Sequence, residues 1–455
     1  MIARKPNGTE LKDFYDFVVI GGGPAGASFA TIAAEHGRSV LVLEYAKFPR
    51  FVVGEIIAPT AIWRNWARLG LTREMLDDMF IQKWGGQFVA SSGARFNFEQ
   101  DVFPDEEACQ AFVYTLDRAV YDEFLLNWAR EKGATALEEA RVDDVLYDEN
   151  GRMNGVRFTR HGETHEVNCH LVVDASGRAN YLGRKLGLRQ EMSRLKSFAT
   201  FAHWEGAKRE SGIDEGNFYI YFDENRWIWW APLKGNRVSV GLVSSRDEHW
   251  DEYVELGADK FYEKYVLMRP EVADALENAK RVTSLKPAPR KNAEGPEYEG
   301  YHYYATEQVG DGWVLLGDAS GFVDPIFSAG LNIVQSCGIK LADLCHEGLE
   351  KGDLSKEYLM QYEKWYVEEF KGILSHIHTF AELYFNRKFI DLFLKLGNTK
   401  ERFRRLYIDV FIAWDKDAIV EYGEMLRTRF RYNEKTWGEQ LEEIAAESAA
   451  AAAKG

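Results

Sequence analysis

Cysteine and long apolar segments are scarce in this sequence. Its 455 residues include only four cysteines, which form no Cys-x-x-Cys pair and show no zinc-type spacing. A disulfide scaffold and a structural zinc site are therefore excluded as the basis of the fold, and a reduced, cytoplasmic location is predicted. Residues 1–11 are polar, so no secretory signal is expected, and no apolar run reaches the length that crosses a membrane.

Positive charge is also in short supply. Lys and Arg number 56 against 72 Asp and Glu, which gives a formal net charge of -16. A chain with this balance repels phosphate backbones and anionic lipid headgroups. The composition therefore argues against nucleic acid or a membrane surface as a partner.

The first motif lies near the N-terminus, between two apolar segments. Asp16 to Ile20 and Ser39 to Glu44 predict buried parallel strands, and a small-residue helix is expected between them. A Gly-x-Gly-x-x-Gly turn precedes this helix. Such glycines permit a tight turn and the close approach of a pyrophosphate, which the helix N-terminus attracts. The predicted dinucleotide-binding residues are Gly21, Gly23, Pro24, Ala25 and Gly26, with Glu44 placed for an adenosine ribose.

The whole pattern predicts an α/β fold. We expect a Rossmann-like FAD-binding domain, an antiparallel β-sheet substrate domain built around the aromatic strands of residues 198–245, and a helical C-terminal region. The alanine-rich end is predicted to be a frayed or disordered tail. The predicted boundaries are 13–80, 110–190 and 300–350 for the cofactor domain, 81–109 and 191–299 for the substrate domain, 351–440 for the helical region and 441–455 for the tail.

Three segments resemble the flavoproteins related to para-hydroxybenzoate hydroxylase. Trp313 to Ser320 (WVLLGDAS) is similar to the Gly-Asp motif of that group, in which an Asp carboxylate binds the ribityl chain of FAD; Asp318 is that position here. Leu171 to Arg178 (LVVDASGR) resembles the group's Asp-Gly motif, and Arg118 resembles an arginine that reaches the flavin. The resemblance implies FAD, and no second Gly-x-Gly-x-x-Gly turn with strand and helix flanks provides a nicotinamide site.

The sequence context of Lys83, which follows the Gly54-Glu55 motif and a predicted helix, resembles that of a lysine in the flavin-dependent halogenases in particular. Lys83 begins a strand that leaves the cofactor domain. In halogenases a lysine in this setting lies at the far end of a tunnel from the flavin, where it hydrogen-bonds hypohalous acid or becomes a haloamine. An ammonium suits this role because it is a compact donor whose pKa shifts readily on burial. The resemblance implies that Lys83 is the catalytic residue.

A tryptophan-rich strand carries the second halogenase resemblance. Trp227 to Pro232 (WIWWAP) is similar to the motif Trp-x-Trp-x-Ile-Pro, with Ala231 in place of the isoleucine. Trp227 and Trp229 alternate along the strand and therefore share a face. The resemblance implies that Trp227, Trp229 and Pro232 form a barrier between the flavin and the organic substrate.

The loop after the Gly-Asp motif carries the third halogenase resemblance. Phe322 to Gly330 matches the halogenase pattern Phe-x-x-Pro-x-x-Ser-x-Gly, and the resemblance implies that Pro325 and Gly330 contact the cofactor. Backbone N–H groups of Ser328, Ala329 and Gly330 are candidates for binding a halide ion as an anion nest. Halogenases of free tryptophan have a glutamate base in this loop, whereas here Asp324 is the only carboxylate, as in phenol- and pyrrole-type halogenases.

The chemistry implied by the resemblance uses FAD as FADH2, O2 and a halide ion. Halide is oxidised to hypohalous acid and then transferred to an electron-rich aromatic carbon of phenol, pyrrole or indole type. A separate flavin reductase is expected to supply FADH2. The small aromatic substrate, free or bound to a carrier, the choice among chloride, bromide and iodide, and the oligomeric state stay open at this point.

Other functions compete with this interpretation. An aromatic monooxygenase would need its substrate at the flavin edge, which the tryptophan pair would block. A geranylgeranyl reductase-like FAD oxidoreductase would need a long apolar tunnel, and a flavin-carrying binding protein would make the lysine incidental. Metal binding is not predicted, because the histidine pairs 161/165 and 376/378 lack further ligands in the sequence around them.

Overall fold

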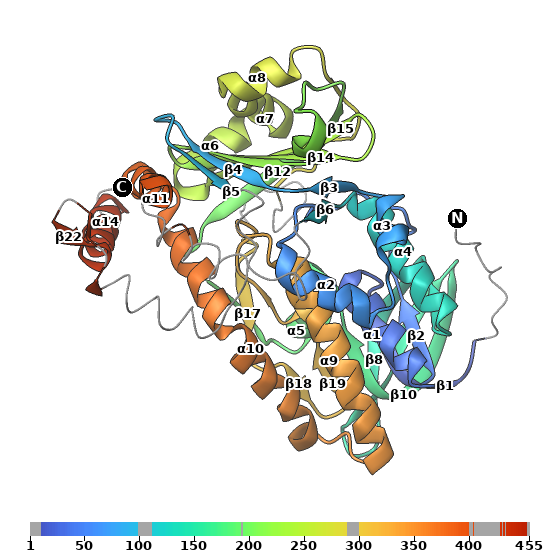
Figure 1. Cartoon of the computed structure of the whole chain (residues 1–455). Helices are drawn as coiled ribbons and strands as arrows, with labels where there is room; N and C mark the ends of the chain where they lie inside the picture. The colour runs from blue at the N-terminus through green and yellow to red at the C-terminus, as the bar shows by residue number, and fades with distance from the viewer. Residues whose placement is uncertain are drawn as a thin grey trace.

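The structure is a computed structural model. It describes residues 11–98, 112–192, 194–288, 300–399, 404, 428–429, 431–432 and 434–452. The element order begins with alternating strands and helices, continues with a second sheet and ends in helices (Figure 1).

The first sheet contains the N-terminal strand and is parallel at its centre. Its strands are β1 Phe14–Ile20, β2 Val40–Leu43, β7 Thr135–Leu137, β8 Ala140–Tyr147, β9 Met153–Arg160, β10 Glu163–Asp174, β18 Val309–Gly310 and β19 Trp313–Leu315. The strand order is β18-β19-β10-β1-β2-β7, with the β8–β9 hairpin added through β9 to β10. Pairing is parallel from β19 to β7 and antiparallel elsewhere.

Both faces of this sheet are covered. Phe17 and Val19 of β1 pack with the helices, whereas Val18 and Ile20 face the β8–β9 hairpin side. This alternation explains why β1 is apolar at almost every position, as expected of a parallel strand buried on both faces. The helices of this part of the chain are α1 Pro24–Glu35, α2 Pro59–Arg68, α3 Arg73–Asp77, α4 Arg118–Glu131, α5 Tyr181–Lys185 and α9 Gly330–Lys351.

The parallel register brings four strand ends to one edge of the sheet. Ile20 lies opposite both Leu43 and Asp174, and Asp174 lies opposite Leu315. The glycine turn, Glu44, the 174–178 segment and the Gly-Asp motif therefore emerge side by side at the carboxyl ends of the strands. Ligands of open α/β sheets bind at this edge.

The second sheet is mixed. Its strands are β4 Gly86–Ala90, β5 Arg95–Phe98, β12 Ser197–Glu205, β13 Phe218–Asp223, β14 Arg226–Leu233, β15 Arg237–Ser245 and β16 Lys280–Arg281, in the order β16-β12-β15-β14-β13-β4-β5. All pairs are antiparallel except β13 with β4. These strands lie within the two segments predicted as the substrate domain, and the exact boundaries of that domain stay a prediction.

Three helices cover one face of the second sheet, and the sequence analysis did not anticipate them. They are α6 Arg246–Leu256, α7 Ala258–Leu267 and α8 Pro270–Leu276, on the side of the sheet away from α9 in Figure 1. Tyr253, Phe261 and Val266 of these helices pack against Ile228 and Trp230 of the sheet. The other face of β14, with Trp227 and Trp229, belongs to the core shared with the cofactor domain.

The C-terminal region is helical, as predicted, in the part that the structure describes. Helix α10 Lys356–Leu383 runs beside α9, and α11 Arg387–Thr399 follows (Figure 1). The predicted disordered tail is wrong within 441–452, because α14 Trp437–Ala452 is a helix there. Alanine has the highest helix propensity, so an alanine-rich end extends a helix that Ile444 and Trp437 anchor by burial.

Short strands complete the described structure. They pair β3 Ile81–Lys83 with β6 Val113–Thr115, β17 Tyr303–Ala305 with both β11 Arg189–Glu191 and β20 Gly321–Phe322, and β21 Arg431–Tyr432 with β22 Lys435–Thr436.

Candidate active site

The glycine turn after β1 has the geometry of a phosphate cradle. Gly21 has φ +102°, and a Cβ there would lie 2.5 Å from the Ala175 carbonyl oxygen. A Cβ on Gly26 would lie 2.1 Å from the Gly21 oxygen. A Cβ on Gly23 would meet only Arg50 Nη2, at 3.3 Å, so the space in front of this residue is open apart from one cationic group.

Helix α1 starts at this cradle with Pro24 and Ala25. No side chain caps it, and its first N–H groups have no intrahelical partner, which leaves them available to an anion. Pro24 occupies the first helical position, where the missing N–H costs no hydrogen bond.

Glu44 ties the end of β2 to the glycine turn. Its Oε2 accepts a 2.8 Å hydrogen bond from Gly22 N, and its Oε1 accepts one of the same length from Ala46 N. The side chain is buried, and a carboxylate with two such bonds keeps lone pairs for hydroxyl donors. The predicted ribose contact is compatible with this geometry.

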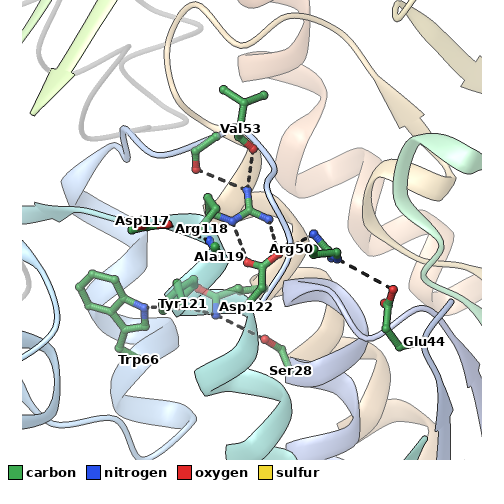
Figure 2. Close-up of polar contacts among 12 residues, drawn as sticks. Ser28, Glu44, Arg50, Val53, Trp66, Asp117, Arg118, Ala119, Tyr121 and Asp122 are labelled. Carbon is green, nitrogen blue, oxygen red and sulfur yellow. Dashed lines mark hydrogen bonds and ion pairs between the residues drawn. The ribbon is translucent and has the colours of Figure 1, made fainter. Parts of the chain in front are cut away.

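A charged cluster stands beside the cradle (Figure 2). Arg118 Nε and Nη2 donate to the two oxygens of Asp122 at 2.7 and 3.0 Å, and Arg118 Nη1 donates to the Val53 carbonyl at 3.0 Å. Arg50 Nη1 lies 3.2 Å from Asp122 and its Nε lies 3.9 Å from Glu44. Burial opposes the Arg118 charge, but the carboxylates of Asp122, Asp318 and Glu55 together outweigh burial and raise the pKa of the guanidinium.

Sequence reasoning missed Arg50 and Asp122. The spacing of Arg118 and Asp122, one turn apart on a helix, was a signal that could have found the second of them. Arg50 gave no such signal, since it reaches the cluster through the loop after β2.

Asp318 follows β19 at the same edge of the sheet. Its side chain accepts no hydrogen bond from the residues that the structure describes, although its backbone carbonyl accepts one from Tyr303 Oη at 2.6 Å. Burial raises the pKa of this carboxyl to about 6, while Arg178 and Arg118 lower it in part. A carboxylate without partners at the rim of a phosphate cradle fits the predicted contact with a ribityl hydroxyl.

The Asp-Gly-like motif plays a different part. Asp174 Oδ1 accepts from Ser176 N at 2.9 Å and Oδ2 accepts from Leu182 N at 2.7 Å. Its carboxylate therefore fixes the 174–182 backbone, against which Gly21 packs.

Lys83 is buried, with 7% of its surface exposed. Its Nζ donates to the Ile57 carbonyl oxygen at 2.5 Å and lies 4.9 Å from the centroid of the Phe218 ring. Among the described residues no carboxylate forms an ion pair with it. Burial alone lowers the pKa of this ammonium to about 7.

One peptide group connects Lys83 to the loop after Gly-Asp. The carbonyl of Ile57 accepts from Lys83, and the N–H of the same peptide, on Ala58, donates to the Ser328 carbonyl at 3.4 Å. Because a peptide group spans little more than 2 Å between its O and N atoms, Lys83 Nζ lies no more than about 8 Å from the Ser328 oxygen. The predicted lysine and the predicted halide loop are neighbours, although 245 positions separate them in the chain.

The loop itself adopts a constrained turn. Ser328 has φ +55°, which is uncommon for a residue other than glycine. Ser328 N donates to the Pro325 carbonyl at 2.9 Å, so this N–H is engaged and is not a free halide donor as the sequence analysis had expected. Ala329 and Gly330 start α9, where helix geometry provides no intrahelical partner for their N–H groups.

The tryptophan strand places two indoles on one face. Trp227 and Trp229 have ring centroids 6.1 Å apart and pack toward the shared core, with 2% and 7% of their surfaces exposed. Trp229 Nε1 donates to Ser239 Oγ at 3.2 Å, and a Cβ on Gly241 would collide with the Trp229 ring. Pro232 is buried opposite Val238 near the end of the same strand.

Two buried polar clusters escaped sequence reasoning. His203 Nε2 lies 2.6 Å from Glu55 Oε1, and both side chains are almost fully buried. Asp324, the carboxylate of the loop, contacts His302 and Tyr384 at 3.3 and 3.0 Å. Only the position of Glu55 after Gly54 gave a hint of the first cluster.

This arrangement defines a class of protein. A parallel α/β sheet with a glycine cradle, an acidic residue after the second strand and an Asp at the Gly-Asp edge is a dinucleotide-binding flavoprotein. The second sheet contributes the paired indoles, and the short β3–β6 pair contributes the buried lysine.

Comparison with known proteins identifies the family. The tryptophan halogenase family model matches residues 93–388. A 1H-pyrrole-2-carbonyl-[peptidyl-carrier protein] chlorinase from Pseudomonas fluorescens is 30% identical over 372 residues, which cover 77% of this chain and 79% of the chlorinase. The corresponding brominase from Pseudoalteromonas luteoviolacea is 28% identical over 362 residues, which cover 77% of this chain and 82% of the brominase.

A solved structure agrees. The flavin-dependent brominase Bmp2 has a TM-score of 0.73 and 26% identity, over 90% of this chain and 99% of the brominase. The chain belongs to the flavin-dependent halogenases, which are oxidoreductases that use FAD and a halide ion. Membership in this family favours the halogenase over the monooxygenase, reductase and binding-protein alternatives.

Within the described ranges, no group of three or more His, Cys, Asp or Glu side chains is placed to hold a metal ion. None of the helices in those ranges has the length and apolar character needed to cross a bilayer.

Proposed function

We propose that this enzyme is a FADH2- and O2-dependent halogenase that delivers halogen to an aromatic substrate through Lys83. The observation that carries the proposal is the Ile57–Ala58 peptide group, which joins the buried Lys83 ammonium to Ser328 of the halide loop. A lysine exposed at the surface of a substrate domain would not be connected to this loop through a buried peptide group.

The cofactor would lie in the cradle described above. Gly21, Gly23 and the N-terminus of α1 would hold its pyrophosphate, Glu44 its adenosine ribose and Asp318 its ribityl chain, with Arg118 near the flavin. When bound, reduced FAD would supply two electrons to O2, and oxygen reduced to the peroxide level would oxidise halide to hypohalous acid with release of water.

The protein's own part in the reaction starts with halide. The N–H groups of Ala329 and Gly330, at the positive end of the α9 dipole, would bind the anion next to the flavin position. Trp227 and Trp229 would separate this site from the organic substrate, so that only a small oxidised halide species passes.

Lys83 would then receive the hypohalous acid. A neutral amine can attack it, forming an N–halogen bond with release of water, and the halogen then passes to an aromatic carbon whose proton is lost. An ammonium can instead hydrogen-bond the acid and polarise it. A pKa near 7 makes both forms available at neutral pH.

The substrate class is an electron-rich aromatic of phenol, pyrrole or indole type, free or bound to a carrier. The relatives from Pseudomonas fluorescens and Pseudoalteromonas luteoviolacea act on a carrier-bound pyrrole, and the extra glutamate that tryptophan-directed enzymes have just before the serine of this loop is absent here, where Phe327 stands. A separate reductase would supply FADH2.

A direct experiment tests this function. Purified enzyme receives FAD, a flavin reductase with NADH, O2 and bromide, together with a panel of phenols, indoles and pyrroles, and mass spectrometry detects products. We expect brominated product from at least one panel member and none when bromide or the reductase is omitted. Hydroxylated product that forms without bromide would instead show a monooxygenase.

A further inference from the structure

A buried hydroxyl at the C-terminal end of α10, on the capping residue Tyr384, meets the halide loop. Tyr384 Oη donates to Asp324 Oδ2 at 3.0 Å and also lies 2.9 Å from Ser197 Oγ. The same ring meets the Trp227 indole edge-on, with centroids 6.0 Å apart. One side chain therefore contacts the halide loop, the barrier strand and the start of β12.

Asp324 shapes the loop from within. Its Oδ1 accepts from Ile326 N at 3.0 Å, and its Oδ2 faces both Tyr384 and His302. The side chains of Asp324 and His302 are fully buried, and a buried carboxylate is tolerated only when its oxygens have partners. With both oxygens engaged, Asp324 is a structural anchor of the turn rather than a free base.

The same face of α10 holds the loop at a second point. Phe380, one helical turn before Tyr384, packs against Phe327 with ring centroids 4.8 Å apart. Phe327 also contacts Phe88 of the second sheet, at 6.5 Å. The loop is thus held by α10 through a polar contact at Asp324 and an apolar contact at Phe327.

The backbone of the loop explains why such anchoring is needed. A left-handed conformation at Ser328 costs free energy and persists only where the surroundings impose it. Ser328 directly precedes the two N–H groups proposed to bind halide. A change in the position of Asp324 would therefore move these donors and the contact between the Ser328 carbonyl and Ala58.

We propose that Tyr384, acting through Asp324, is a positioning residue that holds the halide loop and the Trp227 barrier in one arrangement. The proposal rests on the proposed halogenase function, since it concerns the halide site of that function. Its consequence is that the C-terminal end of helix α10 sets both halide affinity and the fraction of oxidised halide that reaches substrate.

The test uses full-length enzyme loaded with FAD. Tyr384→Phe removes one hydroxyl and keeps the ring, and Asp324→Asn keeps the shape of the carboxylate. Tyr362→Phe serves as a matched control, because Tyr362 is equally buried and forms no hydrogen bond or ring contact with residues 324–330 in the described structure. Bromide binding is measured without turnover, from the change in the visible absorption of oxidised flavin. Under turnover, hydrogen peroxide and brominated product are measured per O2 consumed.

We expect Tyr384→Phe and Asp324→Asn each to weaken bromide binding roughly three- to tenfold, the effect of losing one buried hydrogen bond. Both variants should release a larger share of O2 as peroxide, with unchanged FAD content. The double variant should bind bromide no more weakly than Asp324→Asn alone, because both changes break the same link. Tyr362→Phe should change thermal stability only.

Other results overturn the proposal. If Tyr384→Phe lowers the melting temperature but leaves the bromide Kd and the peroxide share at wild-type values, Tyr384 has only a structural role. If wild-type enzyme binds bromide yet brominates nothing in the panel, the proposed function fails, and the bromide titration still decides the role of Tyr384. Absence of bromide binding in the wild type would overturn both.

Discussion

The cofactor side and the substrate side of the site differ in whether their buried charged groups are paired. On the cofactor side, Arg118, Asp122 and Arg50 form a largely buried cluster in which each charge has an opposite charge beside it. On the substrate side, Lys83 is buried against the Phe218 ring with one carbonyl as its hydrogen-bond partner. Paired charges fix the geometry of a binding site, whereas an unpaired buried amine has a perturbed pKa that suits chemistry.

The difference extends to the covering residues. The cradle is made of backbone and small residues that leave room for a ligand, while the indoles of β14 pack with phenyl rings in the core shared with the second sheet. In the proposed function, the cofactor half binds and the aromatic half restricts what can pass. Three kinds of substitution separate these roles. They are loss of the Lys83 amine, replacement of the Trp227 indole and addition of a methyl group to the glycine cradle.

Loss of the amine should have the largest effect. We expect Lys83→Met to reduce brominated product by on the order of 100-fold or more, since the variant lacks the group proposed to transfer halogen. Bound FAD and O2 consumption should stay at wild-type levels. Removing a desolvated amine should also raise the free energy of unfolding at neutral pH by about 1–3 kcal/mol, which urea denaturation measures.

A half-exposed lysine is the control for this variant. Lys196→Met removes an ion pair with Asp247 on the surface and should leave product formation unchanged. Normal bromination by Lys83→Met would disprove the transfer role.

Replacement of Trp227, one of the two indoles of the proposed barrier, should have the next largest effect. We expect Trp227→Leu to raise the fraction of O2 released as peroxide, or of hydroxylated product, several-fold, because the opened wall admits water or substrate. Stability should fall by about 3 kcal/mol from the lost burial. Product and peroxide analysis under turnover gives the result.

Trp230→Leu separates the barrier from plain stability. Trp230 is as buried as Trp227 and on the same strand, but it faces α6–α8 on the other side of the sheet. It should cost similar stability with normal coupling. Equal peroxide release from the two variants would contradict the barrier role.

The same contrast explains what the sequence could predict. The cofactor motifs are local: the glycine turn, Glu44 and the Gly-Asp edge follow from short segments whose strand ends the parallel register aligns. On the substrate side, the hydrogen bonds that connect buried polar residues are not local in sequence. Tyr384 and Asp324 are 60 positions apart, and His203 and Glu55 are 148 apart, so only packing reveals them.

Helices α6–α8 and α14 were missed for another reason. The first three are short, are separated by Gly257 and Pro270, and take their stability from packing on the second sheet rather than from propensity. At the C-terminus the alanine run was judged by its position at the chain end, although its helix propensity was the stronger signal.

Filling the cradle should affect cofactor binding alone. Gly23 has φ -68°, which alanine adopts freely, and its Cβ would meet only Arg50. We expect Gly23→Ala to weaken FAD binding on the order of tenfold, because the methyl group occupies the approach of the pyrophosphate. The apoprotein should unfold within about 0.5 kcal/mol of wild type. Fluorescence titration with FAD and denaturation of the apoprotein provide the measurements.

Gly21→Ala is the matched contrast. Its positive φ and its 2.5 Å approach to Ala175 mean that the apoprotein itself should be destabilised. If Gly23→Ala bound FAD normally, the pyrophosphate would have to lie elsewhere.

The pH dependence of turnover sharpens the role of the amine. Lys83 has no ion-pair partner among the described residues, which favours its neutral form, and burial places its pKa at about 7. If the neutral amine accepts the halogen, the rate of product formation should increase roughly tenfold per pH unit as the pH is raised toward 7. Above pH 7 the rate should level off. Bromination rates from pH 5.5 to 9, corrected for FADH2 supply, test this. A rate that falls as pH rises through 7 would instead assign the transfer to the ammonium.

The pKa of Lys83 also affects stability, and the sign of this effect is independent of turnover. Between about pH 7 and the ordinary lysine value near 10, the native state binds fewer protons at Lys83 than the unfolded chain does. The free energy of unfolding of wild type, relative to Lys83→Met, should therefore rise with pH across this window by up to about 1.4 kcal/mol per unit. Using the difference between the two proteins cancels the titration of all other groups. A difference that stays flat would mean that Lys83 keeps its proton when the chain folds, and the unpaired amine would then no longer distinguish the two halves of the site.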